Sequence, residues 1–166
     1  MEIWRDIKGF ETYKISNLGN VKNSRNMILK PGKNTTVYLQ ASLFLNGKCK
    51  KVLVHRLVAY AFITNEEDLE YIDHIDGNPL NNNVENLRYC TLSQNQGNRR
   101  KQTKEGTSKY KGVYWNIHAN KWIARLQIAR VSKYLGLFDS EEDAANAYDT
   151  AATEHFKEFK YLNFQD

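Results

Sequence analysis

Residues 72–95 read IDHIDGNPLNNNVENLRYCTLSQN, and this stretch decides how the centre of the 166-residue chain folds. Ile72–Ile75 is predicted as a short strand, and Asp76–Asn83, built from Asp, Gly, Asn and Pro, as the loop after it. Thr91–Gln94 has the spacing of a capping box, which predicts a helix that begins there and runs to about residue 100. The stretch therefore predicts a strand, a loop and a helix close together along the chain.

The polar residues of this stretch have the chemistry that hydrolysis of a phosphodiester requires. An Asp-His pair, Asp73 and His74, is followed by Asn86 and then by Asn95. The Asp73 carboxylate and the Asn95 amide are hard oxygen donors for a divalent cation, which would stabilise the charge of the transition state. His74 can deprotonate water, and Asn86 is expected to orient its imidazole by a hydrogen bond. Because neighbours on a regular strand point to opposite faces, a local twist is expected to bring Asp73 and His74 to one site.

The stretch resembles the HNH (ββα-metal) nuclease family, specifically its phage intron-type homing endonucleases, over roughly residues 50–100. The matching text is Val54-His-Arg-Leu-Val-Ala-x-x-Phe62, Ile72-Asp-His-Ile-Asp-Gly-Asn78, Asn83-x-x-Asn86-Leu-Arg and Thr91-x-x-Gln-Asn95. The resemblance implies a strand–loop–strand–helix finger in which Asp73 and Asn95 bind the metal, His74 is the general base and Asn86 supports the site. It also implies a divalent cofactor, Mg²⁺ with Mn²⁺ as a substitute. The third signature position is Asn95 rather than His, which is a common variant of the family.

Other polar residues near the stretch leave alternatives open. His55 is either an orienting or packing residue at the start of a helix, which is the favoured interpretation, or a contact to phosphate. Asp76 is a candidate for an acid that supports the site from behind the metal ligands. The remaining amides of the loop are interpreted as turn formers rather than ligands: Asn78, Asn81, Asn82 and Asn83.

Charge is distributed in blocks along the chain, whose net charge is +5. Residues 1–60 hold eleven Lys and Arg against three Asp and Glu, and residues 99–133 hold ten against one. Residues 64–87 hold seven acids and no Lys or Arg, and residues 138–158 hold seven acids and one Lys. Basic blocks can bind a polyanion and an acidic centre suits a cation, with ordinary solvated surface as the alternative.

Composition narrows the class of protein. With 41% hydrophobic residues and two Pro, the chain is not expected to be disordered as a whole. No apolar run is long enough to span a membrane and no signal pattern opens the chain, so we expect a cytoplasmic location (the host cytoplasm for a phage-encoded protein) and no membrane partner. Cys49 and Cys90 form no Cys-x-x-Cys pair, so no structural zinc is expected, and a disulfide between them is not expected either. We expect a monomer or a weak dimer.

The first fifty residues are predicted to be rich in strands. Two alternating segments flank a turn at Asn17–Asn20, and Asn46-Gly47 is predicted to join Thr36–Leu45 to Lys50–Val54 in a hairpin. Arg56–Ile63 has apolar side chains at helical spacing. The text Trp4-x-x-Ile-x-Gly-Phe-Glu-x-Tyr-Lys-Ile-Ser-Asn-Leu-Gly-Asn-Val21 resembles a small module that is often attached to such nucleases. We interpret it as a β element that either contacts DNA or completes the core.

The last part of the chain is predicted as a sheet backed by a helix. The strands are Tyr110–Asn116, Lys121–Ile128 and Lys133–Phe138, and Ser140 is predicted to cap a helix over about residues 141–156. The middle strand alternates, so that one set is expected to pack on the alanine stripe of the helix and the other to face outward. The inward set is Trp122, Ala124, Leu126 and Ile128, and the outward set is Lys121, Ile123, Arg125 and Gln127.

This part resembles the plant ethylene-response-factor (APETALA-type) DNA-binding domain over about residues 107–165. The matching text is Ser108-x-Tyr-x-Gly-Val113, Lys121-Trp-x-Ala124, Leu135-Gly-x-Phe138, Glu142-x-Ala-Ala-x-Ala-Tyr-Asp149-x-Ala-Ala152 and Asn163-Phe164. The resemblance implies a three-stranded sheet that enters the major groove of double-stranded DNA, backed by one helix. The plant family is rich in Arg along its first strand, where this chain has Lys111, Tyr114 and Asn116, so the family's base preference does not carry over.

We therefore predict an α+β fold: a β-rich module over residues 1–50, a ββα-metal HNH finger over 51–101, a linker over 102–108, and a three-stranded antiparallel sheet packed on one helix over 109–166. The predicted function is a metal-dependent, site-recognising DNA endonuclease of the HNH homing type, which nicks DNA or cuts both strands. A DNA-binding regulator with an inactive finger is the alternative, and RNA is disfavoured because its major groove is too narrow to read. The predicted DNA-binding residues are Arg99, Arg100, Lys101, Lys111, Tyr114, Lys121, Arg125 and Gln127, with Lys104 in the same basic tether.

Overall fold

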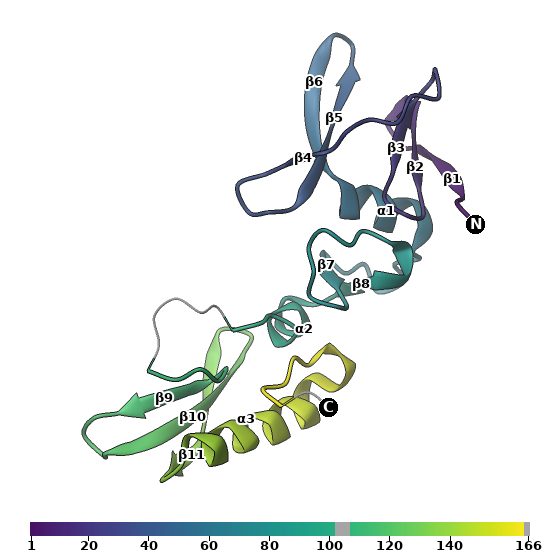
Figure 1. Cartoon of the computed structure of the whole chain (residues 1–166). Helices are drawn as coiled ribbons and strands as arrows, with labels where there is room; N and C mark the ends of the chain where they lie inside the picture. The colour runs from purple at the N-terminus through teal and green to yellow at the C-terminus, as the bar shows by residue number, and fades with distance from the viewer. Residues whose placement is uncertain (102–106, 165–166) are drawn as a thin grey trace. The chain divides into compact units, whose positions relative to one another are not determined.

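The computed structural model describes residues 1–101 and 107–164 and confirms the predicted α+β fold class (Figure 1). The chain divides into two compact units, Met1–Cys90 and Thr91–Asp166. The first unit contains the predicted β-rich module together with both strands of the predicted finger, and the second begins at the helix that follows them. No helix in the described part of the chain is long and apolar enough to cross a membrane.

Strands dominate the first unit and pair in small antiparallel sheets. The sheets have the orders β1-β2-β3, β4-β5-β6 and β7-β8. In chain order the elements are β1 (Trp4–Ile7), β2 (Phe10–Ser16), β3 (Val21–Asn23), β4 (Gly32–Lys33), β5 (Leu39–Leu45), β6 (Lys48–Leu53), α1 (Val54–Phe62), β7 (Tyr71–His74), a 3₁₀ turn (Val84–Asn86) and β8 (Leu87–Cys90).

The predicted hairpin between β5 and β6 is present, but both strands differ from the predicted bounds, since β6 spans Lys48–Leu53 rather than Lys50–Val54. Asn46 and Gly47 both have positive φ, +50° and +75°, as a two-residue turn between antiparallel strands requires. Strand β5 begins later than predicted, because the preceding residues form a turn around Asn34. The Oδ1 atom of Asn34 accepts hydrogen bonds from the backbone N–H groups of Thr36 and Tyr38. A local side-chain bond therefore competes with the strand there.

One hydrophobic core joins the N-terminal module to the rest of the first unit. Ile15 on β2 and Leu43 on β5 are fully buried, in the same cluster as Val54 and Val58 on α1 and Leu87 on β8. Helix α1 can supply these contacts because its apolar side chains recur on one face. The module thus completes the core on which the β7–β8 hairpin rests.

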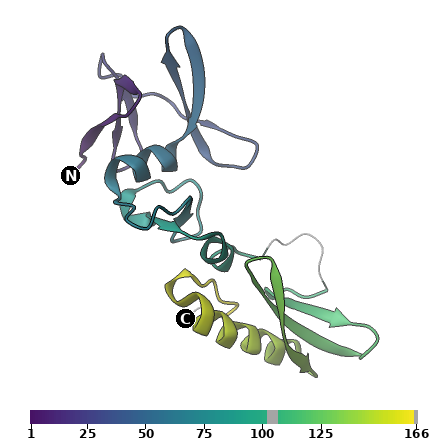
Figure 2. The same cartoon turned by 180° about the vertical axis from the view of Figure 1, so that it is seen from behind.

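The second unit is a three-stranded antiparallel sheet with a helix along one face (Figure 2). Its elements are α2 (Leu92–Gly97), β9 (Val113–Asn116), β10 (Lys121–Ile128), β11 (Val131–Phe138), α3 (Glu141–Phe156) and a 3₁₀ turn (Lys157–Phe159). Ser140 caps α3 by accepting a hydrogen bond from the N–H of Asp143, and the helix has the predicted bounds. Ala124 on β10 is fully buried against Ala144 and Ala145 of α3, because small side chains allow helix and sheet to approach closely.

Helix α2 has the predicted capping box but ends earlier than predicted, at Gly97. Its last carbonyls have partners outside the helix: the carbonyl of Gly97 accepts hydrogen bonds from Tyr161 N–H at 3.0 Å and from Lys111 Nζ at 2.6 Å. A Cβ on Gly97 would also lie 2.6 Å from a ring carbon of Phe156. Contacts with distant residues therefore end the helix, which the local sequence did not reveal.

The alternation along β10 is confirmed for the inward set, since Ala124 and Leu126 are buried. Ile123 in the outward set differs from expectation, because it is only 8% exposed. It lies directly opposite Tyr114 on β9 and Leu137 on β11, and this cross-strand row covers it. The outward face thus has an apolar centre between its polar residues.

Candidate active site

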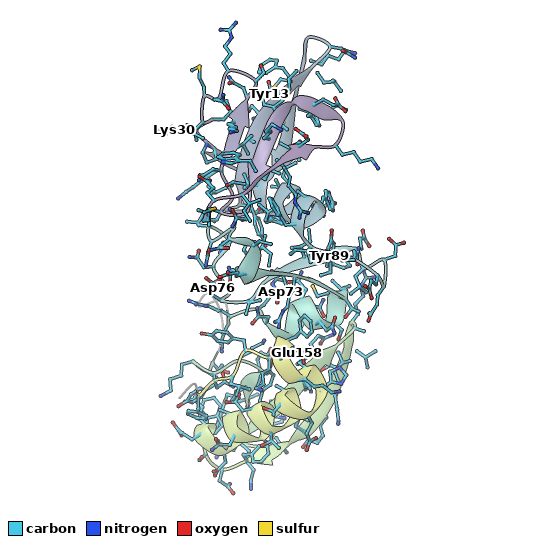
Figure 3. All side chains as sticks on the ribbon, turned by 90° about the vertical axis from the view of Figure 1, so that its right-hand side faces the viewer. Tyr13, Lys30, Asp73, Asp76, Tyr89 and Glu158 are labelled. Atoms are coloured by element: carbon cyan, nitrogen blue, oxygen red, sulfur yellow. The ribbon has the colours of Figure 1, made fainter. Side chains whose placement is uncertain are left out.

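Asp73 and His74 are the last two residues of strand β7, and both are buried, at 4% and 6% exposure. Strand β7 pairs with β8 so that Asp73 lies opposite Arg88 and His74 lies opposite Leu87. Figure 3 shows Asp73 on this hairpin and Asp76 on the loop that follows β7. The Asp-His pair therefore lies where a strand ends in a polar loop, as predicted.

The buried carboxylate of Asp73 is compensated by Arg88. The Nε and Nη2 atoms of Arg88 approach Oδ2 of Asp73 at 3.0 and 2.9 Å. A carboxylate removed from water needs such a partner, because an uncompensated buried charge is strongly destabilising. Arg88 is part of the Asn86-Leu-Arg motif text, but only the strand register shows that it pairs with Asp73.

The imidazole of His74 is held by Asn82. The Nε2 atom of His74 lies 3.1 Å from Oδ1 of Asn82, which is itself 4% exposed. Because an amide oxygen only accepts, Nε2 carries the hydrogen and Nδ1 carries the lone pair in the neutral ring. The sequence predicts that Asn86 makes this bond and that Asn82 forms a turn, and the structure corrects this prediction, because Asn82 holds Nε2 of His74.

Asn86 organises the loop that leads to it. Its Nδ2 donates to Oδ1 of Asp76 at 2.9 Å and to the carbonyl of Asn81 at 2.8 Å, and its Oδ1 accepts from the N–H of Asp76 at 3.0 Å. Partial burial opposes ionisation of Asp76, but hydrogen bonds from Asn81, the Asn78 backbone and Asn86 outweigh it and lower the pKa of that carboxyl. Asn86 and Asp76 therefore fix the shape of the loop that carries Asn82.

His74 also packs in a cluster of rings with His55 and Tyr38. The ring centroid of His55 lies 5.1 Å from that of His74 and 5.0 Å from that of Tyr38. His55 is the second residue of α1 and is 6% exposed. Its Nδ1 has no hydrogen-bond partner among the residues that the structure describes. This burial agrees with the packing interpretation of His55.

Burial changes the protonation of both histidines. It lowers the pKa of His55 to about 4, and the charges of His74 and Arg56 act in the same direction. Burial also lowers the pKa of His74, although the Asn82 hydrogen bond and the charges of Asp73 and Asp76 act in the opposite direction. The His74 ring is therefore neutral at neutral pH, which is the form that can accept a proton.

In the second unit, the sheet face away from α3 carries the exposed residues Tyr114, Arg125 and Gln127. They line a hollow of about 550 Å³ together with residues that include Tyr148 of α3. Lys121 is the first residue of β10, the central strand, and its Nζ is 2.9 Å from Oδ1 of Asp139. Four of the predicted DNA-binding residues are thus on or beside one face of the sheet.

Two predicted DNA-binding lysines bond to backbone carbonyls. Lys111 donates to Gly97 at the end of α2, and burial lowers its pKa to about 8. Lys101 donates to the carbonyls of Ser108 and Tyr110. These lysines hold the second unit together in addition to carrying positive charge.

The remaining basic candidates follow helix α2. Arg99 and Arg100 are exposed, and together with Lys111 and Gln127 they border a hollow of about 390 Å³. Of the predicted linker, residues 102–106 lie outside the described part of the chain, and they include Lys104.

Two segments of the chain match the models of known protein families. Residues 52–96 match the model of the HNH endonuclease family, and residues 2–44 match the NUMOD4 motif. We refer to residues 52–96 as the HNH domain after this match. This HNH domain includes Asp73, His74 and Asn95, and the NUMOD4 segment ends within β5.

Individual relatives cover parts of the chain. The DNA endonuclease I-HmuI of Bacillus phage SP01 is 41% identical over 99 residues, which are 55% of this chain and 54% of that protein. A solved structure on DNA binding and cleavage by the HNH homing endonuclease I-HmuI is 42% identical, with a TM-score of 0.52 and coverage of 57% of this chain and 55% of that one. The chain thus spans about half the length of these relatives.

The C-terminal part has a more limited likeness. The ethylene-responsive transcription factor WRI1 of Arabidopsis thaliana is 44% identical over 52 residues, which are 30% of this chain and 12% of that protein.

The HNH domain offers few protein ligands to a cation. Among the residues that the structure describes, no group of three or more His, Cys, Asp and Glu side chains is placed to hold a metal ion. The Asp73 carboxylate has the chemistry for a hard divalent cation, whose other ligands can be amide, water and phosphate oxygens. Asn95 lies on α2 in the second unit, so its pairing with Asp73 remains a prediction from the sequence.

Proposed function

We propose that this chain is a metal-dependent endonuclease of the HNH homing type, which recognises a DNA site and hydrolyses phosphodiester bonds there. The observation that carries the proposal is the buried imidazole of His74, neutral and held by Asn82, next along the strand to the Asp73–Arg88 pair. The match of residues 52–96 to the HNH endonuclease family and the likeness to I-HmuI support it.

His74 is the proposed general base. With its Nε2–H directed to Asn82, the Nδ1 lone pair accepts a proton from the attacking water. The imidazolium that forms is favoured by the negative charges of Asp73 and Asp76, which raise the proton affinity of the ring. The same acceptor on Asn82 serves both protonation states, so the ring can take up and release a proton without reorientation.

A divalent cation, Mg²⁺ with Mn²⁺ as a substitute, is the proposed cofactor. Asp73 and Asn95 would hold it, and the assignment of Asn95 rests on its place in the motif. Such a cation, when bound, supplies positive charge to the phosphate and the leaving oxygen. Asn86 is proposed to support the site through the loop that carries Asn82.

Double-stranded DNA is the proposed partner of the second unit. Arg125 and Gln127 can bond to purine edges in the major groove, and Tyr114 borders the same hollow. The sheet face presents Arg125 and Lys121, whereas the helix on the other face begins with three acids, so a polyanion would approach the sheet. Basic residues around the end of α2 are proposed to meet phosphates: Arg99, Arg100, Lys101 and Lys111. A monomer or weak dimer in the cytoplasm remains our expectation.

Cleavage of a supercoiled plasmid tests the proposal against the alternative of a DNA-binding regulator. The chain should cut with Mg²⁺ or Mn²⁺ and not with EDTA. Asp73→Ala and Asn95→Ala should each raise the metal concentration needed for half-maximal rate, because each removes one of few oxygen ligands. Glu67→Ala, at an exposed acid outside the motif, is the control. A chain that binds DNA and cuts it with neither metal would be a regulator.

A further inference from the structure

The turn between β2 and β3 touches the loop that carries Asn82. Gly19 lies in this turn with φ of +85°, and a Cβ on it would be 2.9 Å from Cβ of Asn82 and 3.3 Å from the Asn82 carbonyl oxygen. Two residues earlier, the carbonyl of Asn17 accepts a hydrogen bond from the N–H of Val84 at 2.8 Å. The NUMOD4 segment, residues 2–44, therefore meets the active-site loop at two neighbouring points.

The turn is built to be rigid. Ser16 is fully buried, and its Oγ accepts hydrogen bonds from the N–H groups of Leu18 and Asn20 at 3.3 and 3.0 Å. The backbone closes the same turn through Ser16 N–H to Asn20 carbonyl, at 2.8 Å, and Gly19 N–H to Ser16 carbonyl, at 3.0 Å. A turn fixed by four hydrogen bonds can hold a neighbouring loop in place, whereas a loose one would yield to it.

We propose that the NUMOD4 segment acts as a positioning element of the nuclease site and that Gly19 is its positioning residue. The absent side chain at Gly19 lets the rigid turn rest against Asn82, and Asn82 in turn holds Nε2 of His74. This role goes beyond core completion, because the contact falls on the residue that orients the proposed base. It rests on the proposed function of His74.

Glycines elsewhere in the first unit provide a matched control. Gly9 has almost the same φ as Gly19, +81°, but a Cβ there would meet no atom within 4 Å. Asn tolerates positive φ better than other side chains, so Gly19→Asn and Gly9→Asn carry similar backbone strain. The two variants differ in whether the new side chain collides with Asn82.

The test compares both variants of the full chain with the wild type. Gly19→Asn should lower the single-turnover cleavage rate by about 10- to 100-fold, the loss expected from a displaced catalytic group. Its affinity for DNA in EDTA and its melting temperature should match those of Gly9→Asn. In ¹⁵N spectra of the imidazole, His74 should change its tautomer signal in Gly19→Asn and keep it in Gly9→Asn.

The possible failures can be told apart. Equal cleavage rates and unchanged His74 signals in both variants would overturn the positioning role while leaving the nuclease intact. A melting temperature that falls in Gly19→Asn with no change in the His74 signal would show a structural role and overturn the proposal as well. If the wild type cuts no DNA, or if His74→Ala cuts as fast as the wild type, the proposed function fails and this inference fails with it.

Discussion

Among single residues, the two buried histidines of the first unit are used in different ways. His74 has a hydrogen-bond acceptor and two carboxylates that oppose the effect of burial on its pKa. For His55, the neighbouring charges add to the effect of burial. One ring can therefore take up a proton during a reaction, and the other stays neutral and packs against it.

Removing the imidazole of His74 should slow cleavage strongly without weakening the binding of DNA. His74→Ala is expected to slow plasmid cleavage by about 10²- to 10⁴-fold, which is the usual contribution of a general base. Affinity for DNA in EDTA should change little. His155→Ala, at an exposed histidine of α3, should behave like the wild type. Cleavage by His74→Ala at the wild-type rate would contradict the assignment.

His55 should make the first unit sensitive to acid. Its pKa is about 4 in the folded chain and near 6.5 in the unfolded chain, so between these values the unfolded state binds a proton that the folded state does not. Stability from this group is therefore complete above pH 6.5 and is lost as the pH falls towards 4, by about 2–3 kcal/mol at pH 4.5. Urea unfolding of wild type and His55→Phe at pH 7.5 and 4.5 measures this difference. An equal loss of stability in both proteins would exclude the role of His55.

At the scale of elements, residues within or next to helix α3 predicted its bounds, whereas contacts with residues far away in the sequence determine where helix α2 ends. The Ser140 cap and the alanine stripe lie within α3 or next to it, so its bounds could be predicted from the sequence. Helix α2 ends where Gly97 meets Lys111, Phe156 and Tyr161, which lie far away in the sequence. The start of α2 depends on its own capping box and was predicted correctly.

In the loop after β7, which carries Asn82, the sequence likewise does not indicate which side chains bond to each other. Residues 78–83 include four Asn, and their side chains have identical chemistry. Which of them bonds to His74 depends on how the loop folds back over β7, and that path is fixed by Asn86 and Asp76. The residue types and the strand could be predicted, but the choice between Asn82 and Asn86 needed the structure.

Lys111 precedes β9 and bonds to the end of α2, so its replacement should destabilise the second unit. Lys111→Met keeps most of the side-chain volume and removes the donor to Gly97 and Gln96 at the end of α2. We expect the free energy of unfolding of the second unit to fall by about 1.5–3 kcal/mol, the range for hydrogen bonds that involve charged groups. Lys109→Met, at an exposed lysine, is the control. Equal stability of the two variants in guanidinium unfolding would mean that Lys111 serves DNA binding alone.

At the scale of the whole molecule, the N-terminal module and the HNH strands share one core. From the sequence, completion of the core was one of two alternatives for this module, and local patterns could not decide between them. Ile15, Leu43 and Val58 are each ordinary core residues of their own elements. These residues pack together because segments that are far apart in the sequence come into contact. Hydrophobic periodicity describes one element at a time, so it does not indicate which elements pack together. The same holds for the contact of Gly19 with Asn82.

Helix α2 gives the second unit a role beyond the proposed binding of DNA. It is six residues long, too short to be stable alone, and it packs on β10, α3 and the turn after α3. Deleting residues 107–166 should leave the first unit folded but remove the support of α2, which carries Asn95. We therefore expect the truncated chain to lose metal-dependent cleavage as well as DNA affinity. Arg125→Ala in the full chain keeps that support, so it should weaken DNA binding by about 1–3 kcal/mol in a gel-shift titration and keep the cleavage rate at saturating DNA. A truncated chain that cuts at the wild-type rate would show that Asn95 works without the second unit.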